Sequence, residues 1–295
     1  MKIPPAHTTT MSRRAIAMTL IAMLATAFMT VLASPSSADV PDLEFVSVTG
    51  VSNSDNKGLS VTCPGNKRVV GVGADLDGAR GKVVLDEVVP SLNSVSAHAY
   101  EYGSRYNNDN SGTQDDWRIR VWAYCANPHG AVVTSSRESV NSSNNKSVTV
   151  NCPSGYDVIG SGAELTGALG EVVIDEIIPT ATSVTVRGLE DDTGLAADWK
   201  IRAYAICAQD RPAGLEIISR DSSTGSDDTG TYAHCPGKRA LSGGFDIAGG
   251  AGETGIEDLI PGTDTFVAFA AEEWDGSDGN GRDWFVRTYV ICATQ

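Results

Sequence analysis

Three pairs of adjacent carboxylates are the residues of this chain whose types and spacing could do chemistry. They are Asp86-Glu87, Asp175-Glu176 and Glu257-Asp258, and each pair interrupts an apolar segment. Glycosidases use two carboxylates, but these face each other across the substrate, whereas neighbours on one strand point to opposite faces. A carboxylate among apolar residues is also costly unless it is paired. We therefore expect a structural ion pair at each position rather than a catalytic acid pair.

The expected partners of these carboxylates are three arginines in later apolar segments. Each arginine stands two residues before an aromatic ring, in Arg120-x-Trp122, Arg202-x-Tyr204 and Arg287-x-Tyr289. An arginine is a natural hydrogen-bonding partner for a buried carboxylate, and it also stacks on aromatic rings or on a ligand. The pattern favours one arginine–carboxylate ion pair in each third of the chain.

Tryptophans are the second group of interest, because an aromatic ring can form a flat surface on which a sugar binds. Trp117, Trp199 and Trp284 each lie eight residues before a cysteine. Alternate residues of a strand share a face, so each ring lies on the face of that cysteine and of small apolar residues, which predicts a core position. Trp122 and Trp274 have no tryptophan counterpart elsewhere in the pattern, so they are better candidates for contact with a ligand.

Three loops of different character are where function is expected, since loops tolerate change while the scaffold holds. They cover residues 102–116, 190–198 and 272–283. The candidate ligand contacts are Tyr102, Tyr106, Trp122 and Trp274.

The third loop combines oxygen ligands with glycines, as calcium sites do, although it does not match the EF-hand spacing. A solvated acidic turn is the alternative interpretation. Calcium is the only cofactor that the sequence suggests. The candidate calcium ligands are Asp275, Asp278, Asn280 and Asp283.

These residues recur because the chain repeats one pattern three times, and such a repeat decides the fold. Each repeat opens on Cys-Pro, at Cys63, Cys152 or Cys235, and closes on the segment that begins with the core tryptophan. Between these points, short runs of alternating polar and apolar residues are separated by turns, without a sustained helical period. The sequence predicts an all-β protein of three tandem antiparallel repeats with five or six strands each. The predicted segments are a signal peptide at 1–38 and repeats at 39–128, 129–211 and 212–295.

The connections between repeats are short, at about 126–130 and 208–213. Short linkers leave little slack for independent movement. They favour one pseudo-threefold assembly, such as a β-prism, over three separate sandwiches.

The six cysteines, two in each repeat, predict disulfides in an exported protein. Each expected bridge spans 55 to 62 positions. The chain-entropy model values a bridge of this span at about 4 kcal/mol. The chain lacks Cys-x-x-Cys, which argues against zinc. The repeat selects the pairs Cys63–Cys125, Cys152–Cys207 and Cys235–Cys292.

The first 38 residues have the layout of a secretory signal peptide. Arg13 and Arg14 precede an apolar run over 15–33, and Ser36-Ser37-Ala38 supplies small residues for cleavage. The run is long enough for an uncleaved anchor, but no basic stop-transfer cluster follows it. We expect a secreted, extracellular protein that has no membrane contact after cleavage.

Cleavage would change the formal net charge from −15 to −18, because the segment carries three basic residues and no acidic ones. So acidic a surface repels nucleic acid and anionic membranes, and we expect neither as a partner.

The repeat resembles one found in secreted proteins of streptomycete-type bacteria, over essentially the whole chain after the signal peptide. The shared features are Cys-Pro, Gly-x-Gly, Asp/Glu-Ile-Ile-Pro and a strand from Trp through Tyr-x-Ile-Cys. This resemblance implies no established activity. The segments Cys235-Pro236-Gly237 and Gly244-Phe245-Asp246-Ile247 are also similar to vitelline membrane outer layer protein I, a threefold β-prism. That similarity implies a surface or carbohydrate-related role.

We expect a non-enzymatic protein that binds carbohydrate or another cell-surface polymer through its loops. A threefold framework suits a multivalent binder, because equivalent weak sites add avidity. No nucleophile–base set stands out, and only His98, His129 and His234 follow residue 38, so no catalytic residue is assigned. The alternatives are a structural envelope component or proteinaceous inhibitor with a protein partner, and a hydrolase whose site no motif reveals.

Overall fold

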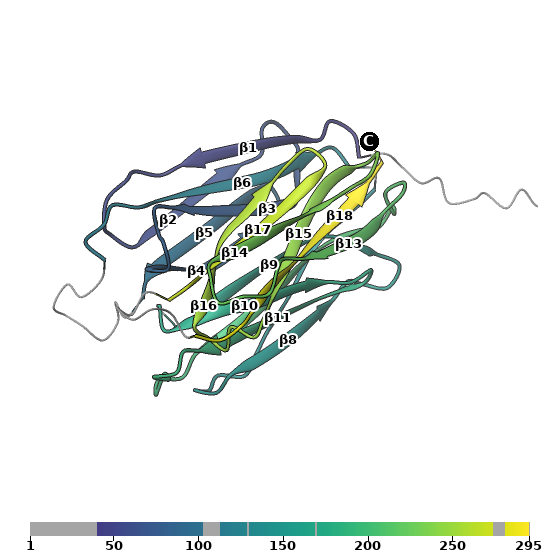
Figure 1. The fold of residues 1–295 in the computed structure, drawn as a ribbon. Coiled ribbons are helices and arrows are strands. Elements are labelled where there is room, and N and C mark those ends of the chain that lie inside the picture. Colours follow the sequence, from purple (N-terminus) through teal and green to yellow (C-terminus); the bar gives the residue numbers. More distant parts are fainter. Residues whose placement is uncertain (1–39, 103–112, 129, 169, 274–280, 295) are drawn as a thin grey trace, which may run out of the picture. The chain divides into compact units, whose positions relative to one another are not determined.

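The computed structural model describes residues 40–102, 113–128, 130–168, 170–273 and 281–294. Its described part is all-β, with eighteen strands in three six-stranded antiparallel sheets (Figure 1). A helix of the length and apolar character needed to cross a membrane does not occur in this part of the chain. The expected signal peptide, residues 1–38, lies outside the described residues.

Each repeat supplies six strands. Repeat 1 supplies β1 (Glu44–Thr49), β2 (Lys57–Thr62), β3 (Arg68–Asp77), β4 (Val83–Pro90), β5 (Ser94–Glu101) and β6 (Arg118–Ala126). Repeat 2 supplies β7 (Val132–Glu138), β8 (Lys146–Asn151), β9 (Asp157–Thr166), β10 (Val172–Pro179), β11 (Ser183–Glu190) and β12 (Lys200–Ala208). Repeat 3 supplies β13 (Glu216–Asp221), β14 (Thr229–His234), β15 (Arg239–Ala248), β16 (Thr254–Pro261), β17 (Thr265–Glu272) and β18 (Phe285–Ala293).

Every sheet is shared between two repeats. The strand order is β1-β6-β3-β16-β17-β14 in sheet I, β2-β5-β4-β9-β12-β7 in sheet II and β13-β18-β15-β10-β11-β8 in sheet III. Each sheet therefore joins three strands of one repeat to three of another, and each repeat takes part in two sheets. This hydrogen-bonded sharing is consistent with the β-prism-like threefold arrangement that the short connections predict.

The apolar strands in the middle of the sheets are covered on both faces, as their composition predicts. In β10, for example, the neighbours Val173 and Ile174 are both buried although they point in opposite directions. Their counterparts in β4, Val84 and Leu85, are buried as well. The edge strands β2 and β8 alternate instead between less and more exposed residues.

Three disulfides have the expected pairing, with each bridge inside one repeat: Cys63–Cys125, Cys152–Cys207 and Cys235–Cys292. Each bridge also connects two sheets. Cys63 directly follows β2 of sheet II, and Cys125 lies in β6 of sheet I. In the same way, the disulfide of repeat 2 connects sheets III and II, and the disulfide of repeat 3 connects sheets I and III. The disulfides thus link each sheet covalently to both others.

The three tryptophans that open the closing strands are fully buried, which confirms the predicted core position. Each indole N–H donates a hydrogen bond to a glutamate at the end of the preceding strand. The bonds are Trp117–Glu101 at 3.3 Å, Trp199–Glu190 at 2.6 Å and Trp284–Glu272 at 2.8 Å. A buried indole needs such a partner, so the glutamate belongs to the repeated framework.

Candidate functional site

The two halves of each sheet meet at a short junction of two residue pairs. One pair at each junction places two carboxylates opposite each other on neighbouring strands. Like charges in this arrangement repel, so a junction needs a compensating cation or proton. The carboxylate pairs are Asp75/Asp258 in sheet I, Glu87/Glu164 in sheet II and Glu176/Asp246 in sheet III. We call each pair, with the side chains that surround it, a junction cluster.

A third carboxylate lies beside each junction pair, because β4, β10 and β16 each contain a β-bulge there. The strand pairing skips Asp86, Asp175 and Glu257, and all three side chains are buried. A bulge inserts an unpaired residue and breaks the alternation of the strand. For the sheet III pair, the expectation that the two acids point to opposite faces is therefore wrong, since both contact one arginine.

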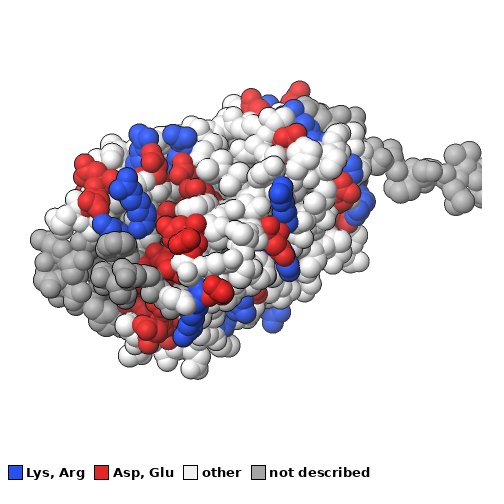
Figure 2. Space-filling model, viewed as in Figure 1, with Lys and Arg blue, Asp and Glu red and all other residues white. Residues whose placement is uncertain are grey.

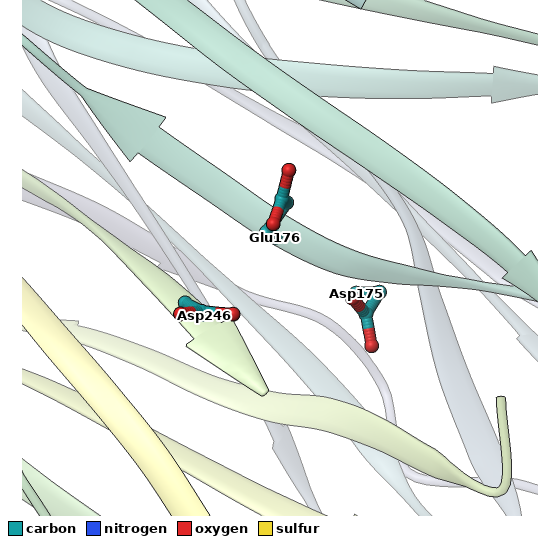
Figure 3. A group of neighbouring side chains, drawn as sticks. All are labelled: Asp175, Glu176 and Asp246. Carbon is teal, nitrogen blue, oxygen red and sulfur yellow. The ribbon is translucent and has the colours of Figure 1, made fainter. Parts of the chain in front are cut away.

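In sheet III the junction cluster surrounds a guanidinium group. Asp175, Glu176 and Asp246 come from β10 and β15 and lie close together (Figure 3), with one oxygen of each within 4.8 Å of the others. Such spacing suits a metal ion, but here Arg187 of β11 supplies the cation. Its Nη2 lies 2.5 Å from Asp175, 3.3 Å from Glu176 and 4.0 Å from Asp246. Burial raises the pKa of Asp175 to about 7, and the charge of Arg187 opposes this rise.

The arginines of the closing strands have different partners from those expected. Arg202 of β12 binds Glu138 at 2.6 Å and Glu164 at 3.1 Å. Arg287 of β18 binds Asp221 at 2.6 Å, and Arg120 of β6 donates to Thr49 at 2.9 Å. The predicted ion pairs are wrong because, within one repeat, the acidic pair and the arginine belong to different sheets.

In sheet II a histidine takes the place of Arg187. His98 of β5 pairs with Glu87, as Arg187 of β11 pairs with Glu176. Its Nδ1 contacts a Glu87 oxygen, and Tyr204 donates a hydrogen bond to Glu164 across the junction. None of these groups bonds to Asp86. Its Oδ1 is buried and has no hydrogen-bond partner within the described part of the chain.

In sheet I a phenylalanine occupies the same register position, since Phe269 pairs with Asp258. With no cation from that strand, Asp75 and Asp258 share a hydrogen bond, which requires a proton on one of them. Burial and the proximity of Asp75 raise the pKa of Asp258 to about 7. The three junctions thus compensate one carboxylate pair in three ways, with Arg187, with His98 together with Arg202, and with a shared proton.

A second polar group lies where turns from all three repeats meet, at the end of the strands from which the variable loops begin. We call this region the loop end. The backbone N–H of Gly81 in repeat 1 donates to Glu257 of repeat 3 at 2.6 Å. The backbone N–H of Asp192 in repeat 2 donates to Glu253 of repeat 3, also at 2.6 Å. Burial raises the pKa of Glu257 to about 8, and the Gly81 hydrogen bond opposes the rise.

Tyr102, a predicted ligand contact, lies in the middle of the loop end. It packs over Gly255 so closely that a Cβ there would lie 2.3 Å from the Tyr102 hydroxyl. This hydroxyl is buried, and none of the described residues hydrogen-bonds to it. Burial and the nearby carboxylates, Glu273 foremost, raise the pKa of Tyr102 well above its ordinary value. Figure 2 shows acidic side chains gathered on the left of the view, where β4 and β16 are labelled in Figure 1.

Two of the other predicted residues, Trp122 and Asp283, lie within the described part of the chain. Trp122 is half-buried in β6 of sheet I, with the Arg120 guanidinium 5.5 Å from its ring centre. Asp283, a predicted calcium ligand, is exposed and directly precedes Trp284. The remaining predicted contacts and ligands fall outside the described residues: Tyr106, Trp274, Asp275, Asp278 and Asn280.

Sequence reasoning missed the second carboxylate of every junction pair. A signal for these residues exists, because an acid follows two residues after a glycine in Gly73-Ala-Asp75, Gly162-Ala-Glu164 and Gly244-Phe-Asp246. An acid that recurs at one register of three apolar strands indicates a shared structural demand. No family model matches the chain, and no curated protein matches its sequence.

Proposed function

We propose that the protein is a non-enzymatic binding protein that recognises carbohydrate or another cell-surface polymer through its loop end. This proposal rests on a contrast between two neighbouring residues in each repeat, the glutamate that binds the core tryptophan and the residue after it. The glutamate that holds the core tryptophan is the same in all three repeats, but the next residue is Tyr102, Asp191 or Glu273. The buried framework is thus the same in all three repeats, whereas the residues that lead from it into the variable loops differ.

The diverged residues have the chemistry that polyhydroxylated ligands use. Carboxylates such as those of Asp191 and Glu273 accept charge-assisted hydrogen bonds from hydroxyl groups. Because the loop end combines turns of three repeats, the surface is a composite one with different groups on each side. This favours one extended contact area over three identical sites.

The carboxylates of the loop end already serve the fold, which supports binding rather than catalysis. Glu257 and Glu253 each accept a backbone hydrogen bond from another repeat, so they hold the turns together. A glycosidase needs two carboxylates that converge on a substrate from opposite sides. Glu257 and Glu253 instead point into the contacts between repeats.

Binding to a panel of glycans and insoluble cell-wall polymers, with and without calcium, tests the proposal. Asp192→Ala removes an exposed carboxylate at the loop end. Asp264→Ala removes a half-exposed one beside His234, in the turn between β16 and β17, and serves as the matched control. We expect saturable binding that Asp192→Ala weakens at least fivefold and Asp264→Ala leaves unchanged. Absence of binding across the panel, or equal loss in both variants, would refute the assignment to the loop end.

A further inference from the structure

The bulge carboxylate of sheet II lacks the cation that its counterpart in sheet III holds, although Arg202 binds Glu164 of the same cluster at 3.1 Å. The two clusters correspond residue by residue through their strand register. Asp86 matches Asp175, Glu87 matches Glu176, Glu164 matches Asp246, and His98 matches Arg187. In sheet III the Arg187 Nε donates to the bulge carboxylate Asp175 at 2.7 Å, and its Nη2 lies 2.5 Å from the same carboxylate.

The bulge carboxylate of sheet II has no such donor. Asp86 is 5% exposed, and its Oδ1 has no hydrogen-bond partner within the described residues. His98 does not replace the arginine, because its ring contacts Glu87 instead. A buried carboxylate oxygen without a partner costs free energy, so this position has an unmet demand for a hydrogen-bond donor.

We propose that Asp86 and Glu87, beside a Glu164 carboxylate that already binds Arg202, form a binding site for a guanidinium group supplied by a ligand. The sister cluster supports this choice, since the same arrangement of carboxylates there encloses the guanidinium of Arg187. A planar guanidinium donates to two carboxylates at once, which suits the adjacent acids Asp86 and Glu87. This proposal concerns a different surface and a different ligand from the loop end.

A bare metal ion fits this cluster less well. Within the described chain, only the sheet III cluster has three such ligand atoms within 4.8 Å of one another. The sheet II acids are therefore more widely spaced, and a larger organic cation spans them better. Tyr204, which donates to Glu164, adds an aromatic ring on which a guanidinium can stack.

The site is open to solvent on its histidine side. The His98 side chain is 44% exposed, whereas those of Glu87 and Glu164 are 15% and 23% exposed. A ligand therefore meets His98 first, and the imidazole signals of His98 report directly on occupancy. His234, which contacts Asp264 on another part of the surface, is an internal control for general salt effects.

The test is a titration of the purified protein with methylguanidinium at millimolar concentration, followed through the histidine NMR signals and by calorimetry. We expect a saturable shift of the His98 signal, no shift of His234 and one site per chain. A blocked arginine peptide tests the source of the group. Equal affinity for both probes indicates recognition of the guanidinium alone, and tighter peptide binding indicates an arginine side chain of a protein partner.

Two variants make the outcome decisive. Asp86→Asn removes the carboxylate with little change of shape and should abolish the shift. His98→Arg builds the arginine of the sister cluster into sheet II, so it should also abolish binding while raising the melting temperature. If His98→Arg does not fold, Asp86→Asn decides alone. The proposal is overturned if methylguanidinium produces no saturable shift, if Asp86→Asn binds as tightly as the parent, or if calcium alone shifts His98.

Discussion

The shared proton of the sheet I junction predicts a specific dependence of stability on pH. Burial and Asp75 raise the pKa of Asp258 to about 7, from an ordinary value of 3.8. The folded protein therefore keeps a proton in this pH window that the unfolded chain releases. The stabilisation is fully present below the ordinary pKa and is lost as the pH rises through the folded value. Each excess proton contributes a slope of about 1.4 kcal/mol per pH unit.

Asp258→Asn isolates this contribution. The amide donates a hydrogen bond to Asp75 without titrating, so it imitates the protonated acid at every pH. We expect the parent and the variant to have similar unfolding free energies below pH 3.8, where the acid is protonated in both states. Between pH 5 and pH 7 the variant should gain up to about 3 kcal/mol over the parent, following that slope over two pH units.

Urea denaturation at pH 5, 6, 7 and 8, with the disulfides intact, measures the difference. The difference between the two proteins is the relevant quantity, because Asp175 and Glu257 also have pKa values raised by burial and tilt both curves. Asp264→Asn, at an acid 48% exposed, is the control and should run parallel to the parent. Parallel curves for Asp258→Asn and the parent would refute the shared proton.

Three further predictions concern the framework. Tyr102→Phe removes a buried hydroxyl without a partner in the described chain, so it should raise the unfolding free energy by about 1 kcal/mol in chemical denaturation. Replacing Cys63 and Cys125 together by alanine should lower it by about 2 to 5 kcal/mol, and a non-reduced peptide map of the parent should show no bridge between repeats. Gly244→Ala should cost about 2 kcal/mol or more, because its Cβ would lie 2.1 Å from the Ile177 carbonyl oxygen, whereas Gly225→Ala meets open space and should change thermal stability little.

The sequence predicts those parts of the fold whose residues recur in every repeat. The disulfide pairing follows from two cysteines at equivalent places, and the core position of Trp199 follows from its shared face with Cys207. Both depend on local alternation along a strand, which a sequence displays directly. The all-β class follows from the same alternation.

The sharing of sheets between repeats could not be predicted in this way. Each junction consists of only two residue pairs, such as Glu87↔Glu164 and Val88↔Ala163, so it leaves almost no pattern in the chain. The bulge at Asp175 breaks the alternation on which the sequence argument about the acidic pairs depends. The true partner of that acid, Arg187, lies in a strand whose arginine has no counterpart in the other repeats. A comparison of the repeats cannot predict contacts that occur in one repeat only.

The three junctions illustrate why differences between the repeats, rather than their shared features, indicate function. Repetition supplies each sheet with the same pair of opposed carboxylates, which repel unless something compensates them. The compensating groups are Arg187 in sheet III, His98 and Arg202 in sheet II, and a proton next to Phe269 in sheet I. The two arginines are permanently charged, whereas the carboxylate pair of sheet I depends on a proton. Arginine side chains of the chain itself therefore supply positive charge at the junctions of sheets II and III, but Asp86 of sheet II has no hydrogen-bond donor for its Oδ1 among the described residues. At Asp86 and in sheet I, a ligand or a proton from the surroundings determines the state of the junction.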